Sequence, residues 1–271
     1  MAVKKKIKNM GMKTVVVVTY LAMILINTLA NVLPINNITT GAVSAKYENL
    51  FTPSGFTFSI WLIIYLVLGA HVFYQFKDVF YSPETRAMVQ KHRKWFSISS
   101  VANTLWILAW HYDFVFLSVL LMFTILFSLL RCMRWIGSAK LTSQERLWIK
   151  KPFSIYLGWI LVATIANMTV LFVKWDWQFW GISESAITGT ILLIGMVISG
   201  LSVLKFKDSL IGAVVLWAYY GILVKHIGVK GFNQMYPSVV NITIASIAGI
   251  ISVMIYNSYH RIEALKQKYL K

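Results

Sequence analysis

The sequence predicts an all-α integral membrane protein with eight transmembrane helices and both termini in the cytoplasm. Composition is the first of three observations that support this fold class. Of the 271 residues, 58% are hydrophobic and only 13% are charged, and the mean hydropathy is +0.67. A soluble domain of this size could not bury so much apolar surface, so a water-soluble enzyme or binding domain is excluded.

Apolar stretches are the second observation. Eight of them are long enough to cross a hydrocarbon core of about 30 Å as helices. They lie approximately at residues 14–33, 56–76, 95–110, 114–130, 153–173, 185–204, 209–224 and 238–257. These stretches account for the composition without any soluble domain.

The distribution of positive charge is the third observation. Segments on the side of the N-terminus hold 22 of the 26 Lys and Arg residues, and the opposite side holds only Lys46, Lys174, Lys225 and Lys230. This asymmetry is the positive-inside pattern of a multi-pass protein, here of the plasma or cytoplasmic membrane. The net charge of +17 is spread over five short segments. It therefore predicts contact with a bilayer carrying anionic headgroups, and no nucleic acid as a partner.

The first stretch follows a lysine-rich segment, as the apolar core of a signal peptide does. It is longer than such a core, and Tyr20, Asn27 and Asn31 share one helical face. We therefore expect a retained first span after a basic cytoplasmic N-terminus, residues 1–13. A second basic cytoplasmic segment, residues 258–271, follows the last span.

The second stretch carries an aromatic stripe. Phe58, Trp61, Tyr65 and Gly69 lie on one helical face, whereas His71 points elsewhere and is interpreted as a packing histidine. The third and fifth stretches repeat the pattern with Asn, Trp and small residues at helical spacing. These are Asn103, Trp106 and Trp110 in the third, and Trp159, Ala163 and Asn167 in the fifth.

Two interpretations of these tryptophans are open. Tryptophans collect in the interfacial belts of membrane proteins, which explains several of the 11 in this chain. Trp61, Trp106 and Trp159 instead share helix faces with amide or small residues at membrane depth. Such faces favour an aromatic-walled pocket between helices.

Catalytic and metal-binding patterns are weak. The five histidines and the single Cys132 show no metal-ligand spacing, so we predict no metal site. No nucleophile stands at a defined spacing from a base, and we expect no enzyme. The nine acidic residues lie in loops or at span ends, where they are poorly placed to carry protons or ions through the membrane. A small-molecule transporter without evident ion coupling therefore stays as the alternative function.

The motifs resemble those of a known family. The run from Phe51 to Gly69, with Trp61 and Tyr65, is similar to the second-helix signature of the tryptophan-rich sensory protein/translocator protein family (TspO/MBR), once called the peripheral benzodiazepine receptor. Asn103-x-x-Trp106 is similar to the family's third-helix motif, and Trp159-x-x-x-Ala163-Thr164-x-x-Asn167 to its fifth-helix motif. The resemblance covers about residues 10–175.

The sequence departs from the family pattern at several places. The proline that precedes the fifth-helix tryptophan would fall at Ile155, and the doubled proline of the first loop is reduced to Pro53. The family core has five helices, and this chain adds three. The resemblance thus implies a TspO-like five-helix bundle over residues 14–175 and a three-helix transmembrane extension over residues 176–257.

The resemblance also implies a tryptophan-rich sensory or receptor-like protein that binds hydrophobic planar ligands, porphyrin and other tetrapyrroles or sterol-like molecules. No cofactor is implied beyond a porphyrin ligand, and a homodimer is an expected partner. Some members are linked to light-dependent porphyrin breakdown, but no catalytic residue is assigned here. The implied ligand-binding residues are Trp61, Tyr65, Asn103, Trp106, Trp159, Ala163 and Asn167. The first loop would act as a lid, with Pro34, Gly41, Phe51 and Pro53.

The last three stretches carry small residues rather than aromatic stripes. Glycines recur at positions 189, 195 and 200 in the sixth stretch and at position 249 in the eighth. Small residues at such spacing allow helices to approach closely. We expect these stretches to pack tightly rather than to form a second site.

Overall fold

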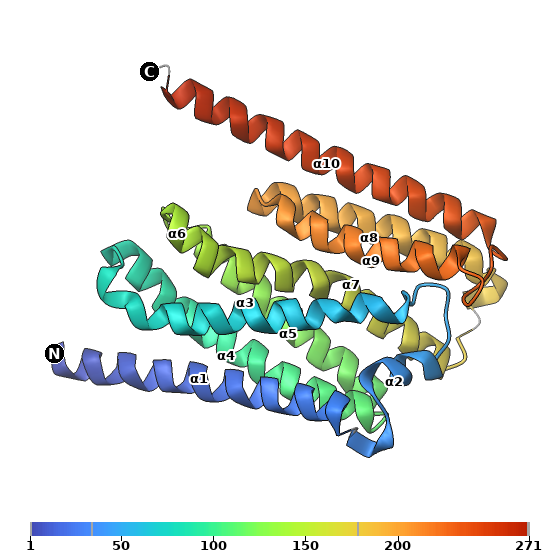
Figure 1. Ribbon diagram of the computed structural model, residues 1–271, viewed down its shortest axis with the longest axis horizontal. Coiled ribbons are helices and arrows are strands. Elements are labelled where there is room, and N and C mark those ends of the chain that lie inside the picture. The colour runs from blue at the N-terminus through green and yellow to red at the C-terminus, as the bar shows by residue number, and fades with distance from the viewer. Residues whose placement is uncertain (1, 34, 178, 270–271) are drawn as a thin grey trace. The chain divides into compact units, whose positions relative to one another are not determined.

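The computed structural model describes residues 2–33, 35–177 and 179–269, and every regular element in these ranges is a helix (Figure 1). Pro34, one of the expected lid residues, lies outside the described residues. The chain divides into two compact units. The first comprises Met1–Tyr47 and Ser59–Ile160, and the second comprises Glu48–Phe58 and Leu161–Lys271.

The first unit is built around α4, which packs along both α1 and α5. Its elements are α1 (Ala2–Val32), η1 (Ile35–Asn37), α2 (Thr40–Lys46), α3 (Ile60–Tyr74), η3 (Gln75–Phe80), α4 (Pro83–His111), α5 (Val115–Ile136), α6 (Ser143–Glu145), the π-helical η4 (Arg146–Lys150) and the first part of α7 (Lys151–Lys174).

The second unit is built around α10, which packs on both α8 and α9. Its elements are most of η2 (Gly55–Ser59), the rest of α7, η5 (Phe179–Gly181), α8 (Glu184–Phe206), α9 (Ser209–Ile227) and α10 (Pro237–Tyr269). The predicted domains are continuous in sequence, whereas the compact units are not. The 48–58 segment belongs to the second unit, and the residues on both sides of it belong to the first.

Local capping defines where several helices begin. The Ser82 hydroxyl accepts a hydrogen bond from the Thr85 backbone N–H, and Pro83 occupies the first turn of α4. Hydrogen bonding to its own backbone N–H and to Ser82 lowers the pKa of Glu84 at this terminus. Thr142 and Glu145 form a reciprocal capping box that starts the α6–η4–α7 segment. These caps satisfy backbone donors that would otherwise lack partners.

The prediction of an all-α integral membrane protein is confirmed. Seven helical segments among the described residues are long and apolar enough to cross a membrane. They are Met10–Val32, Gly55–Lys77, Val115–Ile136, Ser143–Lys174, Glu184–Phe206, Ser209–Ile227 and Pro237–Glu263. The stretch at 95–110 is also helical and lies within α4, but the serines and Asn103 of that helix lower its mean hydropathy. The total of eight spans stays a prediction.

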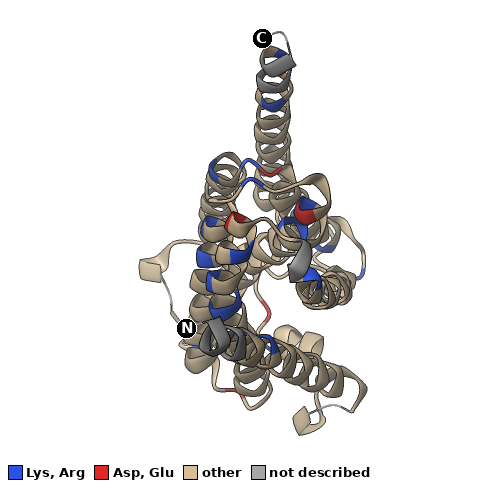
Figure 2. Cartoon of the chain, turned by 90° about the vertical axis from the view of Figure 1, so that its left-hand side faces the viewer, with Lys and Arg blue, Asp and Glu red and all other residues tan. Residues whose placement is uncertain are grey.

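Within each unit the basic connections lie at one end of the helices. In the first unit, the N-terminus and the α3–α4 and α5–α7 connections share one end, while η1 and α2 lie at the other (Figure 1). In the second unit, the α8–α9 turn and the C-terminal end of α10 share one end. Figure 2 shows the Lys and Arg residues in blue and the fewer Asp and Glu residues in red. The placement of both termini in the cytoplasm stays a prediction.

Close helix packing through small residues is confirmed in the second unit. A Cβ atom on Gly195 of α8 would overlap the Tyr219 hydroxyl of α9, which donates a hydrogen bond of 2.7 Å to the Leu192 carbonyl. A Cβ atom on Gly249 of α10 would lie 2.5 Å from the Met196 sulfur of α8. The missing side chains let α8 approach both of its neighbours.

Gly221 of α9 offers a test of how the 48–58 segment is held. The Ser54 N–H donates to the Gly221 carbonyl at 3.0 Å, and the Trp217 indole N–H donates to the Thr57 carbonyl at 3.0 Å. A Cβ atom on Gly221 would overlap the Thr57 side chain. We expect Gly221→Ala to destabilise the second unit by about 1–3 kcal/mol, because the segment must move outward.

Thermal denaturation in detergent measures this effect as a lower Tm. Gly41→Ala is the matched control, since a Cβ atom there meets nothing within 4 Å. The double variant Gly221→Ala/Thr57→Ala should recover part of the loss because it removes the overlapping hydroxyl. An unchanged Tm in Gly221→Ala would show that the segment is not held by this contact.

Candidate functional site

Trp61 of α3 lies at the centre of an aromatic cluster in the first unit. Its ring stacks on Tyr65 at a centroid distance of 5.5 Å and lies 5.8 Å from Trp106 of α4. The edges of Tyr156 and Trp159, both on α7, approach it at 6.2 Å and 6.0 Å. Three helices thus bring their rings together at a single indole.

Helical spacing explains the arrangement within each helix. Tyr65 follows Trp61 by four residues and Trp110 follows Trp106 by four, so each pair can stack along one face. The Trp106 and Trp110 rings stack at 6.1 Å with an angle of 22° between their planes. Each such contact contributes about 0.5–1.5 kcal/mol beyond the burial of apolar area.

A chain of hydrogen bonds between buried polar side chains crosses the unit beside the cluster. The Asn27 amide of α1 donates to the Asn103 Oδ1 atom of α4 at 2.8 Å. The Asn103 amide in turn donates to the Tyr156 hydroxyl of α7 at 3.0 Å. Asn103 and Tyr156 are fully buried and Asn27 is 5% exposed. The three polar side chains satisfy one another where water has little access.

The structure brings together five of the seven residues expected to bind a ligand. Trp61, Tyr65, Trp106 and Trp159 are in ring contact, and Asn103 bonds to Tyr156 of the same cluster. The other two, Ala163 and Asn167, follow Trp159 along α7 at steps of four residues and belong to the second unit. The ligand-binding role of these residues stays a prediction.

Tyr156 is the cluster member that sequence analysis missed. It precedes Trp159 by three residues, so it lies near the same face of α7. That spacing was an available signal, but the motif resemblance begins only at Trp159. Its hydroxyl is the acceptor that completes the hydrogen-bond chain.

The first loop is not a free loop over its first half. Residues Thr40–Lys46, including Gly41, form α2. The His111 ring at the end of α4 donates from Nδ1 to the Ile35 carbonyl at 3.0 Å, so its Nε2 atom accepts from the Thr40 hydroxyl at 3.1 Å. The Trp110 indole N–H donates to the Thr40 carbonyl at 3.3 Å. The segment is therefore anchored to the end of α4 that carries the cluster.

Asp113 adds a second anchor for this segment. Its carboxylate accepts hydrogen bonds from the Tyr47 hydroxyl at 2.6 Å and from the Lys46 ammonium at 3.1 Å. The hydrogen bond to Asp113 raises the pKa of Lys46 above its usual value. Both charged side chains are partly exposed, so the ion pair contributes little by itself. The part-buried hydrogen bond from the Tyr47 hydroxyl to Asp113 is therefore the more important of the two contacts.

The second half of the loop belongs to the second unit. The His226 ring of α9 donates to the Leu50 carbonyl at 2.8 Å, and the Glu184 carboxylate accepts from the Leu50 N–H at 3.2 Å. Phe51 and Pro53, both expected in the lid, are buried. A lid function for the loop stays a prediction, and its two halves are held by different helices.

His71 behaves as the sequence indicated. It is fully buried, donates from Nδ1 to the Trp148 carbonyl at 2.8 Å and accepts at Nε2 from the Gln75 amide at 3.0 Å. Trp148 lies in the π-helical turn η4, where the altered backbone exposes a carbonyl. The histidine is satisfied in the core and is no candidate for ligand contact.

Comparison with protein-family models decides the relationship. The model of the TSPO-like protein family matches residues 13–257. The chain belongs to the TSPO-like protein family. Searches of curated proteins and of solved structures gave no significant match.

The matched range extends the resemblance found in the motifs. It covers the aromatic cluster on α3, α4 and α7, and it continues through α8, α9 and most of α10. The chain is thus a multi-pass TSPO-like membrane protein, and its last three helices are part of the region that the family model describes.

Asn103 is the member of the hydrogen-bond chain with a partner on each side. We expect Asn103→Leu to destabilise the first unit by about 1 kcal/mol or somewhat more, because the Asn27 amide and the Tyr156 hydroxyl each lose a partner. The measurement is the Tm in detergent. Asn31→Leu is the control, since Asn31 is exposed and donates only to a carbonyl of its own helix. Equal Tm values for the two variants would contradict the role of the chain.

Asp113 allows a test of the loop anchor. We expect Asp113→Asn to increase the rate of tryptic cleavage after Lys46 several-fold, because Lys46 loses its charged partner and Tyr47 its strongest acceptor. Asn tolerates the positive φ of 65° at this position, so the backbone turn is retained. Tyr47→Phe, which removes only the hydroxyl, should give an intermediate rate. Cleavage unchanged in both variants would show that the anchor does not restrain the segment.

Proposed function

We propose that this TSPO-like protein is a membrane sensory or receptor protein that binds hydrophobic planar ligands at the aromatic cluster around Trp61. The ligand class is tetrapyrrole, such as porphyrin, or a sterol-like molecule. Convergence of rings from α3, α4 and α7 on one indole is the observation that carries the proposal. We place the protein in the plasma or cytoplasmic membrane, with its basic segments on the cytoplasmic side.

The burial pattern gives the cluster an accessible side. Trp106 and Trp159 are buried, while Trp61 and Tyr65 are only partly so. A flat ligand can therefore lie against the stacked Trp61–Tyr65 pair without the inner rings being displaced. Offset stacking of aromatic faces favours planar π-systems over aliphatic chains of similar volume.

The hydrogen-bond chain supports the site from behind. Asn27, Asn103 and Tyr156 join α1, α4 and α7, so two of the three helices that carry the rings, α4 and α7, are bonded to each other. A prearranged aromatic wall loses little conformational freedom on binding, which favours affinity. These three hydrogen-bonded side chains position the helices, and we assign them no catalytic step.

Porphyrin binding is tested by quenching of tryptophan fluorescence in the purified protein. We expect saturable quenching by protoporphyrin, with an apparent affinity at least fivefold weaker in Trp61→Phe and in Trp159→Phe. Phenylalanine keeps an aromatic ring but offers a smaller stacking face.

Trp135→Phe is the matched control, because Trp135 lies at the end of α5 beneath the Lys91 ammonium and outside the cluster. Its affinity should equal that of the unaltered protein. No saturable quenching, or equal affinity in all three variants, would refute the proposed site.

A further inference from the structure

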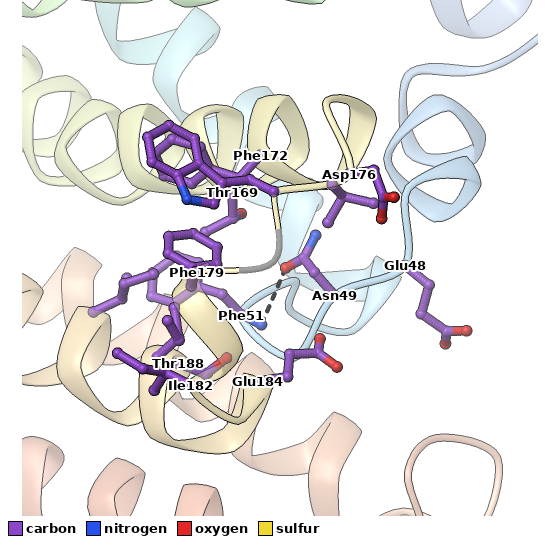
Figure 3. Close-up of a pocket in the computed structure, with 14 residues that line it drawn as sticks. Glu48, Asn49, Phe51, Thr169, Phe172, Asp176, Phe179, Ile182, Glu184 and Thr188 are labelled. Carbon is purple, nitrogen blue, oxygen red and sulfur yellow. Dashed lines mark hydrogen bonds between the residues drawn. The ribbon is translucent and has the colours of Figure 1, made fainter.

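A cavity of about 360 Å³ lies within the second unit, and none of its lining residues belongs to the aromatic cluster described above (Figure 3). Its walls come from the 48–51 segment, the end of α7, the turn after α7 and the start of α8. The volume is in the range of roughly 300–1,000 Å³ that is typical of small-molecule sites. The predicted topology puts these segments on the side of the membrane opposite the N-terminus.

One wall of the cavity is aromatic. The Phe172 ring lies 5.3 Å from Trp177 and 5.2 Å from Phe179, and the Trp177 and Phe179 rings stack at 5.6 Å. Phe179 has a positive φ of 42°, which bulky residues rarely adopt. The turn thus holds the Phe179 ring against the end of α7.

The facing segment is held rigidly by hydrogen bonds. The Asn49 Oδ1 atom accepts from the backbone N–H groups of Phe51 and Thr52 at 3.1 Å and 3.0 Å. The Glu184 carboxylate and the His226 ring bind the two sides of Leu50. Phe51 is 1% exposed as a result. Hydrogen bonds within the second unit therefore fix the backbone of this wall.

The opposite side of the cavity is acidic. Glu48, Asp176 and Glu184 are the three ionisable groups among the lining residues, all carboxylates with exposed side chains. Figure 3 shows them apart from the rings of Phe172 and Phe179. Lys225 interacts electrostatically with Glu48, and Lys174 precedes Asp176 by two residues, but neither lysine lines the cavity.

Aromatic faces next to carboxylates form a recognised environment for organic cations. Rings attract an ammonium group through their quadrupoles, and carboxylates add a favourable potential at the entrance. The same carboxylates repel the propionate groups of a porphyrin. The cavity therefore disfavours a porphyrin, the ligand proposed for the Trp61 cluster.

We propose that this cavity binds an amphiphilic organic cation, with its apolar or aromatic body against Phe172, Trp177 and Phe179 and its ammonium group beside Glu48, Asp176 and Glu184. The site is independent of the porphyrin site proposed above. Its occupant is a quaternary or protonated amine small enough to fit the cavity.

Calorimetric titration of the purified protein with benzyltrimethylammonium tests the proposal. The comparison ligand is neopentylbenzene, the neutral isostere in which carbon replaces nitrogen. We expect saturable binding of the cation, at least tenfold tighter than binding of the isostere. The triple variant Glu48→Gln/Asp176→Asn/Glu184→Gln should weaken cation binding at least tenfold. The amide oxygen that Glu184→Gln introduces can still accept the Leu50 hydrogen bond.

Glu263→Gln is the control, since this carboxylate lies far along α10 and accepts from Tyr259 of the same helix. It should bind the cation as the unaltered protein does. Retained porphyrin quenching in the triple variant reports that it is folded and that the two sites are separate. If the triple variant does not fold, Asp176→Asn alone should weaken the cation about threefold.

Three results would overturn the proposal. They are no saturable binding of the cation, equal affinity for cation and isostere, and unchanged affinity in the carboxylate variants. Failure of porphyrin quenching in the unaltered protein would refute only the proposed function, because the cation titration does not involve Trp61 or Trp159.

Discussion

Polar side chains inside a membrane helix bundle are stabilised when they bond to one another, and the Asn27–Asn103–Tyr156 chain does this for three side chains of the first unit. Each member comes from a different helix, so the chain determines which faces of α1, α4 and α7 oppose one another. Once those faces are set, Trp106 and Trp159 have to point toward α3 and meet Trp61. The three hydrogen-bonding side chains therefore support the α4 and α7 sides of the aromatic cluster, and Tyr156 also contributes a ring to it.

Trp110 links the cluster to the first loop. Its ring stacks on Trp106, and its indole N–H donates to the Thr40 carbonyl of α2. His111, the next residue, holds both Ile35 and Thr40. A change in the position of α2 would thus be felt at the end of α4 that carries the cluster. These contacts join the first half of the loop to the α4 side of the aromatic cluster.

The second unit presents different chemistry within the same TSPO-like chain. Its helices pack through small residues on α8 and α10, and its cavity carries carboxylates, whereas the first unit contains the aromatic cluster. The family model extends across both units. Phe51 is one of the residues that line the cavity. Its neighbour Leu50 is hydrogen-bonded to Glu184 of α8 and to His226 of α9, and these bonds hold the segment in the second unit.

The amino-acid sequence alone determined the membrane class, most helix positions and the grouping of Trp61 with Tyr65 and of Trp106 with Trp110, since apolar length and helical periodicity are properties of single segments. Motif spacing also identified the family. Tertiary structure alone decided that Tyr156 accepts from Asn103, that the loop divides after Tyr47, and that Phe51 and Phe179 face a common cavity. These features depend on which helix faces oppose each other and on hydrogen bonds between distant segments, and no local pattern encodes either one.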